Sequence, residues 1–192
     1  GYYKSSALTD LNAAYDIAKA VYDNKQSAKY AAVYDMLNTE FMKVQNDATA
    51  RVGIVEGNAY RLTNRAYPTL SMSVGTNDVM VGEQTSDYGN TQKWYFEGSG
   101  TEGYYYLKNK ATNTYPGNVE TGQPLSLDKA TKEEAHAYKL QDMGDGIWAL
   151  VGATGLHCSE TQSYQIVGWG ADAEATQWYI TVVETNTNAE AL

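Results

Sequence analysis

The last two thirds of the chain repeats itself with a nearly fixed period. Three similar stretches with a central leucine occur at residues 60–64, 105–109 and 148–152, and their leucines, Leu62, Leu107 and Leu150, are 45 and 43 residues apart. An aromatic residue closes each set, and these residues, Trp94, Tyr138 and Trp178, are 44 and 40 residues apart. Two markers that keep the same period, within the range of roughly 20–50 residues, indicate a fold assembled from repeated supersecondary units.

The residue pattern of the repeats is typical of an all-β fold. Short runs rich in Tyr, Val, Ile and Leu follow Val52 and are separated by Gly, Asn, Asp and Thr every 8–12 residues, which is typical of short strands joined by turns. We predict four strands in each repeat, near residues 59–63, 69–74, 78–82 and 93–97, then 104–108, 114–117, 124–127 and 137–141, then 147–151, 156–159, 164–168 and 177–182.

Twelve strands in three equivalent sets can close around a pseudo-threefold axis. In such an arrangement each repeat buries its leucine and its closing aromatic ring against the other two repeats, because no single repeat can bury them alone. We therefore expect the core of the repeats to contain Leu62, Trp94, Leu107, Tyr138, Leu150 and Trp178.

Residues 5–45, before the repeats, are predicted to form a helical hairpin. Apolar residues recur with the 3-4-3-4 spacing of one helix face at Leu8, Leu11, Tyr15, Ala18 and Tyr22. After a polar interruption at residues 23–26, a second stripe runs through Tyr30, Val33 or Tyr34, Leu37, Phe41 and Val44, with Ser27 placed as a possible N-cap. A two-helix hairpin buries too little to be stable alone, so we expect it to lean on the repeats, on a further helix or on a partner.

Charge and composition exclude several classes of function. The 23 acidic residues outnumber the 14 basic ones and give a net charge of −9, so a phosphate backbone would be repelled and a nucleic-acid partner is not expected. The single cysteine, Cys158, excludes an internal disulfide framework and a thiolate zinc cluster. Apolar runs stay well short of the roughly 20 residues that span a bilayer, so membrane insertion is not expected either.

Each repeat ends in a Gln-x-Trp motif or in a sequence that matches this motif only in part. Gln92-Lys93-Trp94 satisfies the motif fully, Thr176-Gln177-Trp178 keeps the tryptophan, and His136-Ala137-Tyr138 keeps an aromatic residue. A threefold repeat with this ending resembles the ricin-B-type β-trefoil lectins over residues 53–184. The resemblance implies a mainly β fold, a β-trefoil of three four-stranded repeats, and implies that the motif tryptophan belongs to the core rather than to a sugar site.

The resemblance also implies where a sugar would bind. The pockets of this family use an Asp shortly after the first strand, an aromatic platform after the third strand, and an Asn or Gln near the end of the unit. By an ungapped count the Asp position falls on Ser73, Asn118 and Ser159, so none of the three repeats has the acid. Charge-assisted hydrogen bonds are roughly twice as strong as neutral ones, and we expect weak binding of galactose-like sugars, with Asn118 as the best stand-in.

Trp169 is the best candidate for the aromatic platform. It lies between Gly168 and Gly170 after a predicted strand, and small neighbours leave space for a pyranose to stack on an indole; the alternative is a loop tryptophan folded back onto the core. A comparable stretch of the first repeat contains Tyr88, Asn90 and Gln92.

The sequence gives little support for a catalytic site or a metal site. Two dinucleotide-type glycine patterns, at residues 144–149 and 168–173, leave no room for the helix that receives a pyrophosphate. The only histidines, His136 and His157, lie in different repeats, so neither a metal site nor another cofactor is expected. Acidic pairs such as Glu133-Glu134 resemble solvated loop charges rather than the carboxylates of a glycosidase.

The sequence thus predicts three segments: a helical hairpin over residues 1–50, a β-trefoil over 51–184 with repeats at about 53–98, 99–143 and 144–184, and a tail over 185–192. We expect a non-catalytic carbohydrate-binding module of a secreted, periplasmic or cell-surface bacterial protein, with a glycan or polysaccharide as ligand and other domains of a parent protein as possible partners. Two alternatives stay open: a structural or protein-interaction trefoil with vestigial sugar pockets, and an accessory domain of a larger glycoside hydrolase.

Overall fold

The computed structural model describes residues 8–46, 53–86 and 89–186. The chain divides into two compact units, residues 1–54 and residues 55–192, which we call the helical unit and the β unit. Within the described ranges no helix is long and apolar enough to cross a membrane.

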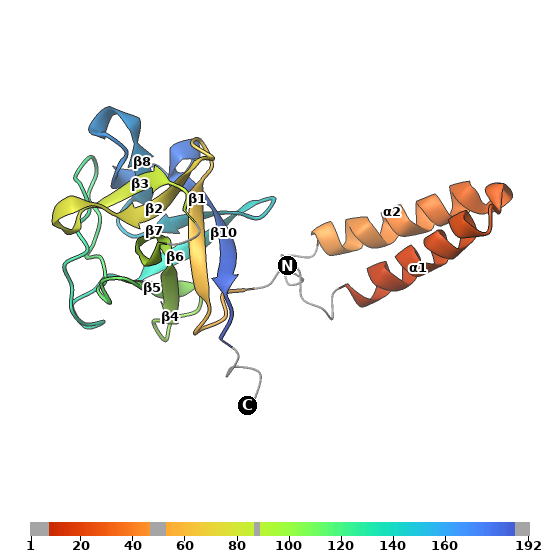
Figure 1. Ribbon diagram of the computed structural model, residues 1–192, viewed down its shortest axis with the longest axis horizontal. Coiled ribbons are helices and arrows are strands. Elements are labelled where there is room, and N and C mark those ends of the chain that lie inside the picture. The colour runs from red at the N-terminus through yellow and green to blue at the C-terminus, as the bar shows by residue number, and fades with distance from the viewer. Residues whose placement is uncertain (1–7, 47–52, 87–88, 187–192) are drawn as a thin grey trace. The chain divides into compact units, whose positions relative to one another are not determined.

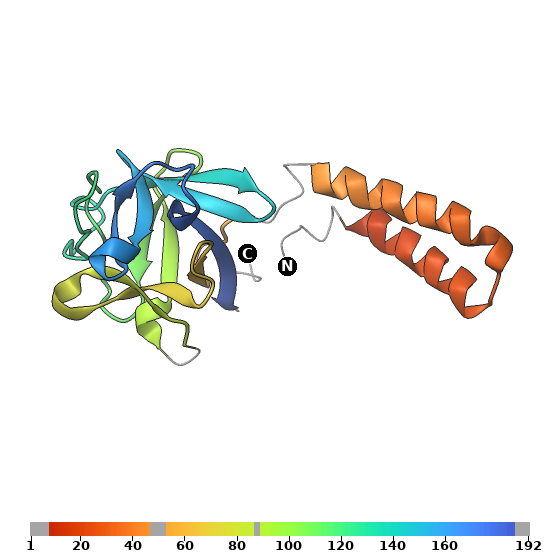
Figure 2. The ribbon, with the colours of Figure 1, turned by 90° about the horizontal axis from the view of Figure 1, so that it is seen from above.

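The helical unit is an antiparallel pair of helices (Figures 1 and 2). Helix α1 spans Thr9–Asp23, a short 3-10 helix η1 spans Ser27–Lys29, and α2 spans Tyr30–Asn46. Lys25 turns the chain between the helices with a left-handed backbone (φ 54°). Ser27 starts the 3-10 turn, and the N-cap position before that turn, Gln26, makes no side-chain capping bond, so the predicted serine cap is wrong.

The two apolar stripes predicted from the sequence are largely exposed. The fully buried apolar residues in the described part of the helical unit are Ala14, Val21 and Val44. Tyr15 and Tyr22, which the spacing placed on the packed face, are 55% and 70% exposed. The reason is that small residues, alanine and valine, allow the two helices to approach, while the bulky rings lie to one side of the contact.

Ten strands lie in the described part of the β unit and form one continuous sheet. They are β1 (Ala59–Asn64), β2 (Leu70–Val74), β3 (Met80–Gln84), β4 (Trp94–Gly98), β5 (Tyr104–Asn109), β6 (Tyr138–Gly144), β7 (Ile147–Val151), β8 (Gly155–Ser159), β9 (Gln165–Trp169) and β10 (Gln177–Glu184). Single 3-10 turns connect several of them: η3 (Thr76–Asp78), η4 (Asn90–Gln92), η5 (Glu160–Gln162) and η6 (Glu174–Thr176).

Six of these strands close into a barrel. The antiparallel pairs β1–β4, β4–β5, β5–β6, β6–β7, β7–β10 and β10–β1 run from each strand to the next and return to the start. The long ladder of β1 with β10, which joins the two ends of the unit, is visible in Figure 1. Closure removes the exposed strand edges of an open sheet.

Three hairpin-like segments cap the barrel. The β2–β3 and β8–β9 hairpins meet through the pair Val81 and Gln165, and the segment between β5 and β6 joins them through isolated bridges from Ser126 to Val79 and from Pro124 to Val167. A closed six-stranded barrel with three two-stranded caps is a β-trefoil, so the predicted fold class is confirmed.

The second cap lacks the two strands predicted at residues 114–117 and 124–127. Pairing there is reduced to single bridges, such as Tyr115 with Lys129. Pro116 and Pro124 lie within the predicted strands, and a proline has no N–H to donate to a ladder. The segment follows the course of a hairpin, but its ladder is interrupted.

Equivalent leucines and aromatic rings fill the barrel. Leu62, Leu107 and Leu150 are buried, as are Trp94, Tyr138 and Trp178. The Trp94 indole N–H donates to the Met72 carbonyl at 3.0 Å, and the Trp178 indole N–H donates to the Leu156 carbonyl at 2.9 Å, across the same separation of 22 residues. The Tyr138 hydroxyl likewise donates to a cap carbonyl, that of Gly117. Each ring therefore ties its barrel strand to its own cap.

Candidate carbohydrate-binding site

Trp169 is an exposed ring held on a rigid strand. It is the last residue of β9, and 52% of its surface is exposed. Strand β9 begins after two left-handed residues, Ser163 and Tyr164, which reverse the chain, and its Gly168 lies against the backbone of Glu120 with a hydrogen bond from the Gly168 N–H to the Glu120 carbonyl at 3.1 Å. The predicted alternative, a tryptophan folded back onto the core, does not match this exposure.

His157 lies beside the exposed indole. Gly155 on β8 is directly opposite Trp169, and His157 is the diagonal neighbour on the same face of the ladder. The two rings have centroids 5.9 Å apart with planes tilted by 41°. Because Gly155 has no side chain, the indole and the imidazole together form the surface at this end of the ladder.

A buried hydroxyl orients the imidazole. Its Nδ1 lies 2.9 Å from the Oγ1 atom of Thr176, which is completely buried. Burial lowers the pKa of His157 below its ordinary value, which favours a neutral ring at neutral pH. Nε2 has no protein partner in the described part of the chain, and a neutral imidazole nitrogen can donate to or accept from a ligand hydroxyl, depending on its tautomer.

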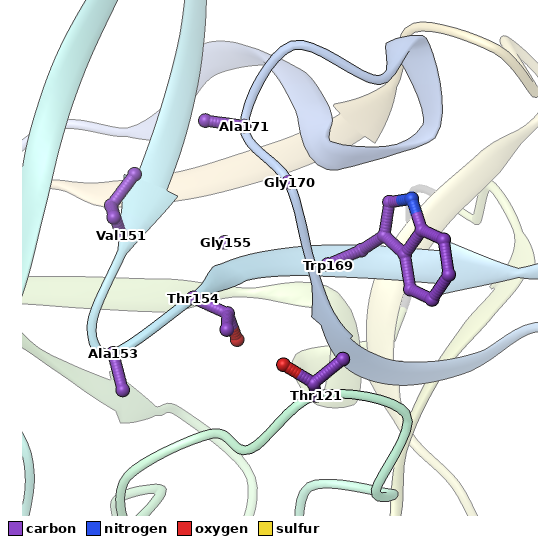
Figure 3. A pocket seen from close by; sticks show the side chains of 8 residues that line it. All are labelled: Thr121, Val151, Ala153, Thr154, Gly155, Trp169, Gly170 and Ala171. Carbon is purple, nitrogen blue, oxygen red and sulfur yellow. The ribbon is translucent and has the colours of Figure 1, made fainter.

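A pocket of about 360 Å³ lies next to Trp169. Its walls carry small and hydroxyl side chains rather than amides, and its lining residues are Thr121, Val151, Ala153, Thr154, Gly155, Trp169, Gly170 and Ala171. Figure 3 shows that the indole projects from the segment 169–171 on the side opposite to Val151 and Ala171. The pocket and the indole therefore flank the same chain segment.

The ladder register identifies the positions equivalent to Trp169 in the other two repeats. Ser71 pairs with Thr63, and Gly155 pairs with Val151, which are the residues directly after the central leucines of their repeats. Ser71 and Gly155 are therefore equivalent. Glu83 lies opposite Ser71, and Trp169 lies opposite Gly155, so Glu83 and Trp169 are equivalent too. In the second repeat Lys129 lies opposite Tyr115. A carboxylate, an ammonium group and an indole thus occupy the same place in the three repeats.

The same register corrects the ungapped count for the expected acid position. Ser73 lies opposite Val81 as His157 lies opposite Val167, so Ser73 is equivalent to His157 and not to Ser159. The count started from Leu70 and Leu156, but the register makes Met72, not Leu70, equivalent to Leu156, because Met72 and Leu156 come directly after Ser71 and Gly155. The Ser73 hydroxyl donates to Glu83 at 2.7 Å, which leaves the first repeat with a carboxylate on this face.

The amide of Gln92 is engaged by the backbone. Gln92 is buried, its Nε2 donates to the Gln84 carbonyl and its Oε1 accepts from the Ser86 N–H, both at 2.8 Å. Neither end is turned to an open surface. Asn90, two residues earlier, is exposed at the start of η4, and Tyr88 lies outside the described residues.

Asn118 supports a neighbouring turn. Its Oδ1 accepts from the Ala153 N–H at 3.3 Å, and a Cβ at Gly152 would lie 3.1 Å from that oxygen and 2.9 Å from Nε2 of His136. Gly152 takes the place of Asn64 and Asn109, whose own side chains accept from the N–H two residues ahead. Asn118 therefore brings an amide oxygen to the turn of the third repeat, where it accepts from the N–H one residue after Gly152.

The chemistry of the remaining polar groups does not resemble a nucleophile or a metal centre. Burial raises the pKa of the Cys158 thiol to about 12, which suppresses the reactive thiolate. Among the residues that the structure describes, no cluster of three or more His, Cys, Asp or Glu side chains could hold a metal ion. The arrangement around Trp169 can stack on an apolar face and exchange hydrogen bonds with hydroxyl groups.

Solved structures of an agglutinin and a lectin share this fold. No protein-family model matches the sequence, and no curated protein matches it either. The Rhizoctonia solani agglutinin is 17% identical with a TM-score of 0.57 and covers 69% of this chain and 99% of its own. A Macrolepiota procera ricin B-like lectin in complex with lactose is 14% identical with a TM-score of 0.52, covering 68% and 99%. These similarities establish the fold, a β-trefoil, at low sequence identity.

A similar structure also occurs within a larger enzyme. A Clostridium perfringens endo-β-galactosidase that releases GlcNAcα1-4Gal is 22% identical with a TM-score of 0.55. The match covers 67% of this chain but only 33% of that enzyme.

Proposed function

We propose that the β unit is a non-catalytic carbohydrate-binding module whose ligand stacks on Trp169. The observation that carries the proposal is the exposed indole at a position where the other repeats have Glu83 and Lys129. A pyranose presents an apolar C–H face and a rim of hydroxyls, and the indole with the neighbouring imidazole offers the matching apolar and polar groups. The Macrolepiota procera lectin, which has the same fold and is in complex with lactose, supports this class of ligand.

The preferred ligand is a neutral sugar. The chain carries a net charge of −9, and Asp172 and Glu174 follow Trp169 as exposed residues. The negative electrostatic potential of these charges would repel an anionic glycan. His157 then supplies a neutral hydrogen bond through Nε2, and Thr121 and Thr154 in the adjacent pocket offer hydroxyls to a second sugar residue.

Stacking on Trp169 sets the expected affinity. About half of an aromatic side chain of roughly 200 Å² is exposed, and covering about 100 Å² at about 25 cal/mol/Å² contributes up to about 2.5 kcal/mol. The entropy lost when the sugar is immobilised and the desolvation of polar groups reduce the net binding free energy. Stacking of about 2.5 kcal/mol corresponds to a dissociation constant of roughly 10 mM, so a single site that adds a few hydrogen bonds to it binds weakly, in the millimolar range.

A glycan array followed by calorimetry with the best neutral ligand tests the proposal. We expect Trp169→Ala to weaken binding roughly 10- to 70-fold, while Glu83→Ala and Lys129→Ala, changes at the equivalent positions, leave it within about twofold. The absence of any carbohydrate binding at millimolar concentration would defeat the function. Binding that survives Trp169→Ala but is lost in one of the two controls would move the site to another repeat.

We further propose that the parent protein acts outside the cell or at the bacterial surface, where free glycans and polysaccharides are found. A second candidate, an accessory module of a larger glycoside hydrolase, is favoured by the endo-β-galactosidase, in which the similar region is one third of the chain. A third candidate is a protein-interaction trefoil, which the charged residues Glu83 and Lys129 at two of the three positions favour. The complete gene product separates these candidates, because an adjoining catalytic domain would support the second.

A further inference from the structure

The helical unit presents an apolar groove that runs across both helices. The groove has a volume of about 410 Å³ and is lined by Leu11, Asn12, Tyr15, Tyr34, Leu37, Asn38 and Phe41. Tyr34 is 68% exposed and Phe41 is 48% exposed. Patches of large exposed rings are uncommon on monomeric proteins and mark surfaces of interaction.

Both helices carry the same seam on this face. On α1 it consists of Leu11, Tyr15, Ala18 and Tyr22, and on α2 of Tyr30, Tyr34, Leu37 and Phe41. The spacing is 4-3-4 on each helix, which is the spacing of residues that interlock between helices in coiled coils and four-helix bundles. The hairpin buries Ala14, Val21 and Val44, and the rings of Tyr22 and Tyr30 contact each other with centroids 6.2 Å apart. The seam therefore runs along one side of the contact between α1 and α2, and its rings remain largely exposed.

We propose that two copies of this chain associate through the helical unit, seam to seam, into a four-helix bundle. Residues that meet their own copies across a twofold axis must be self-complementary. Each of the seven groove residues is uncharged, and the amides of Asn12 and Asn38 both donate and accept. Two copies can therefore bring their grooves together without placing like charges of the groove residues opposite each other, although the net charge of the whole chain is −9.

The exposed aromatic surface approaches the size of a small dimer interface. The five rings of the seam, those of Tyr15, Tyr22, Tyr30, Tyr34 and Phe41, are between 38% and 70% exposed. With roughly 200 Å² for each side chain, they present about 550 Å² per copy. Two copies would bury about 1,100 Å² from these rings alone, close to the lower end of specific interfaces, about 1,200 Å². The leucines and asparagines of the groove add to this area.

Sedimentation velocity on the full chain at about 1–100 µM tests the proposal. The monomer has a mass of 21.1 kDa, and we expect twice that mass at the upper concentrations. Phe41→Asp places a charge in the seam and should raise the dissociation constant at least tenfold. Met42→Asp is the matched control, because Met42 is the adjacent residue, is also exposed, and does not line the groove; it should remain dimeric.

A second measurement separates lost association from lost folding. The helical signal in circular dichroism is recorded for each variant across the same concentrations, and tryptophan fluorescence reports the β unit, which contains all four tryptophans. Association that strengthens the helical signal of the unmodified chain with concentration supports the proposal. A chain that sediments as a monomer at 100 µM, or equal effects of Phe41→Asp and Met42→Asp, would overturn it. The sugar-binding proposal is unaffected by either result.

Discussion

Gly168 and Gly170 flank Trp169, and we expect an alanine to be tolerated at Gly170 alone. A Cβ at Gly168 would lie 2.3 Å from the carbonyl oxygen of Glu120 and 2.5 Å from its carbon, whereas a Cβ at Gly170 would meet no atom within 4 Å. Ordinary contacts begin near 3.4 Å, so Gly168→Ala must move the backbone by about 1 Å. Backbone atoms of a paired segment cannot rotate away as a side chain can.

The cost of this displacement follows from the bonds it breaks. The Gly168 N–H donates to Glu120 at 3.1 Å, and the Gly168 carbonyl accepts from Gly122 at 3.0 Å. Losing both bonds costs about 1 kcal/mol each, and overpacking adds about 1–3 kcal/mol. We expect Gly168→Ala to lower the free energy of unfolding of the β unit by about 3–5 kcal/mol, or its melting temperature by about 10–20 °C, and Gly170→Ala to change it by less than about 0.5 kcal/mol.

Urea unfolding followed by tryptophan fluorescence measures this difference. All four tryptophans lie between residues 94 and 178, so the signal reports the β unit and not the helical unit. Equal stability of the two variants would refute the close approach of β9 to Glu120 on which the position of Trp169 depends.

Two further predictions concern buried polar groups of the β unit. Asn109→Ala removes an amide that accepts from Ala111 at 2.9 Å and from Thr112 at 3.3 Å and donates to Thr91 at 2.8 Å; we expect a loss of about 2–4 kcal/mol in urea unfolding, against almost no change for the exposed control Asn90→Ala. Burial lowers the pKa of His136 and of His157, so the folded state resists their protonation. The free energy of unfolding should be highest above the ordinary histidine pKa of about 6.5 and fall as the pH drops below it; a histidine-dependent gain in stability at pH 5.5 would contradict this sign.

The sequence predicted the barrel well because the barrel depends on a few residues that recur. A leucine and a closing ring in each repeat are buried together at the centre, and replacing one of them would disturb all three repeats. The fold class and ten of the twelve expected strands follow from this period. The two remaining strands are predicted wrongly although the signal is in the sequence, because Pro116 and Pro124 remove N–H donors that a strand ladder needs.

The candidate site stays a prediction. The flanking glycines single out Trp169 in the sequence, whereas the sequence suggests no role for His157 except as a metal ligand. Pairing residues 155–159 with residues 165–169 as an antiparallel hairpin would have placed it beside Trp169, because diagonal neighbours share a face. Asn118 could not be placed from the sequence, since its contact with Ala153 joins two repeats.

The helical unit shows a different limit of sequence reasoning. Spacing identifies the apolar face of a helix, but it does not say what covers that face. The predicted stripes are present on α1 and α2, yet their large rings are exposed while smaller residues fill the contact between the helices. A periodic stripe therefore predicts an interaction surface as readily as an internal core.

The three repeats have similar residues at the buried positions that close the barrel and different residues at the equivalent positions of the caps. Trp94, Tyr138 and Trp178 each donate from a buried ring to a carbonyl of the cap, whereas the equivalent cap positions hold Glu83, Lys129 and Trp169. A change at these cap positions leaves the leucines and rings of the barrel in place, and the buried partner that it would affect is the Ser73 hydroxyl, which donates to Glu83 at 2.7 Å. Function can consequently be lost or gained in one repeat without loss of the barrel. In this chain the proposed sugar contact, Trp169, belongs to the third repeat, and Glu83 and Lys129 make the other two repeats internal controls.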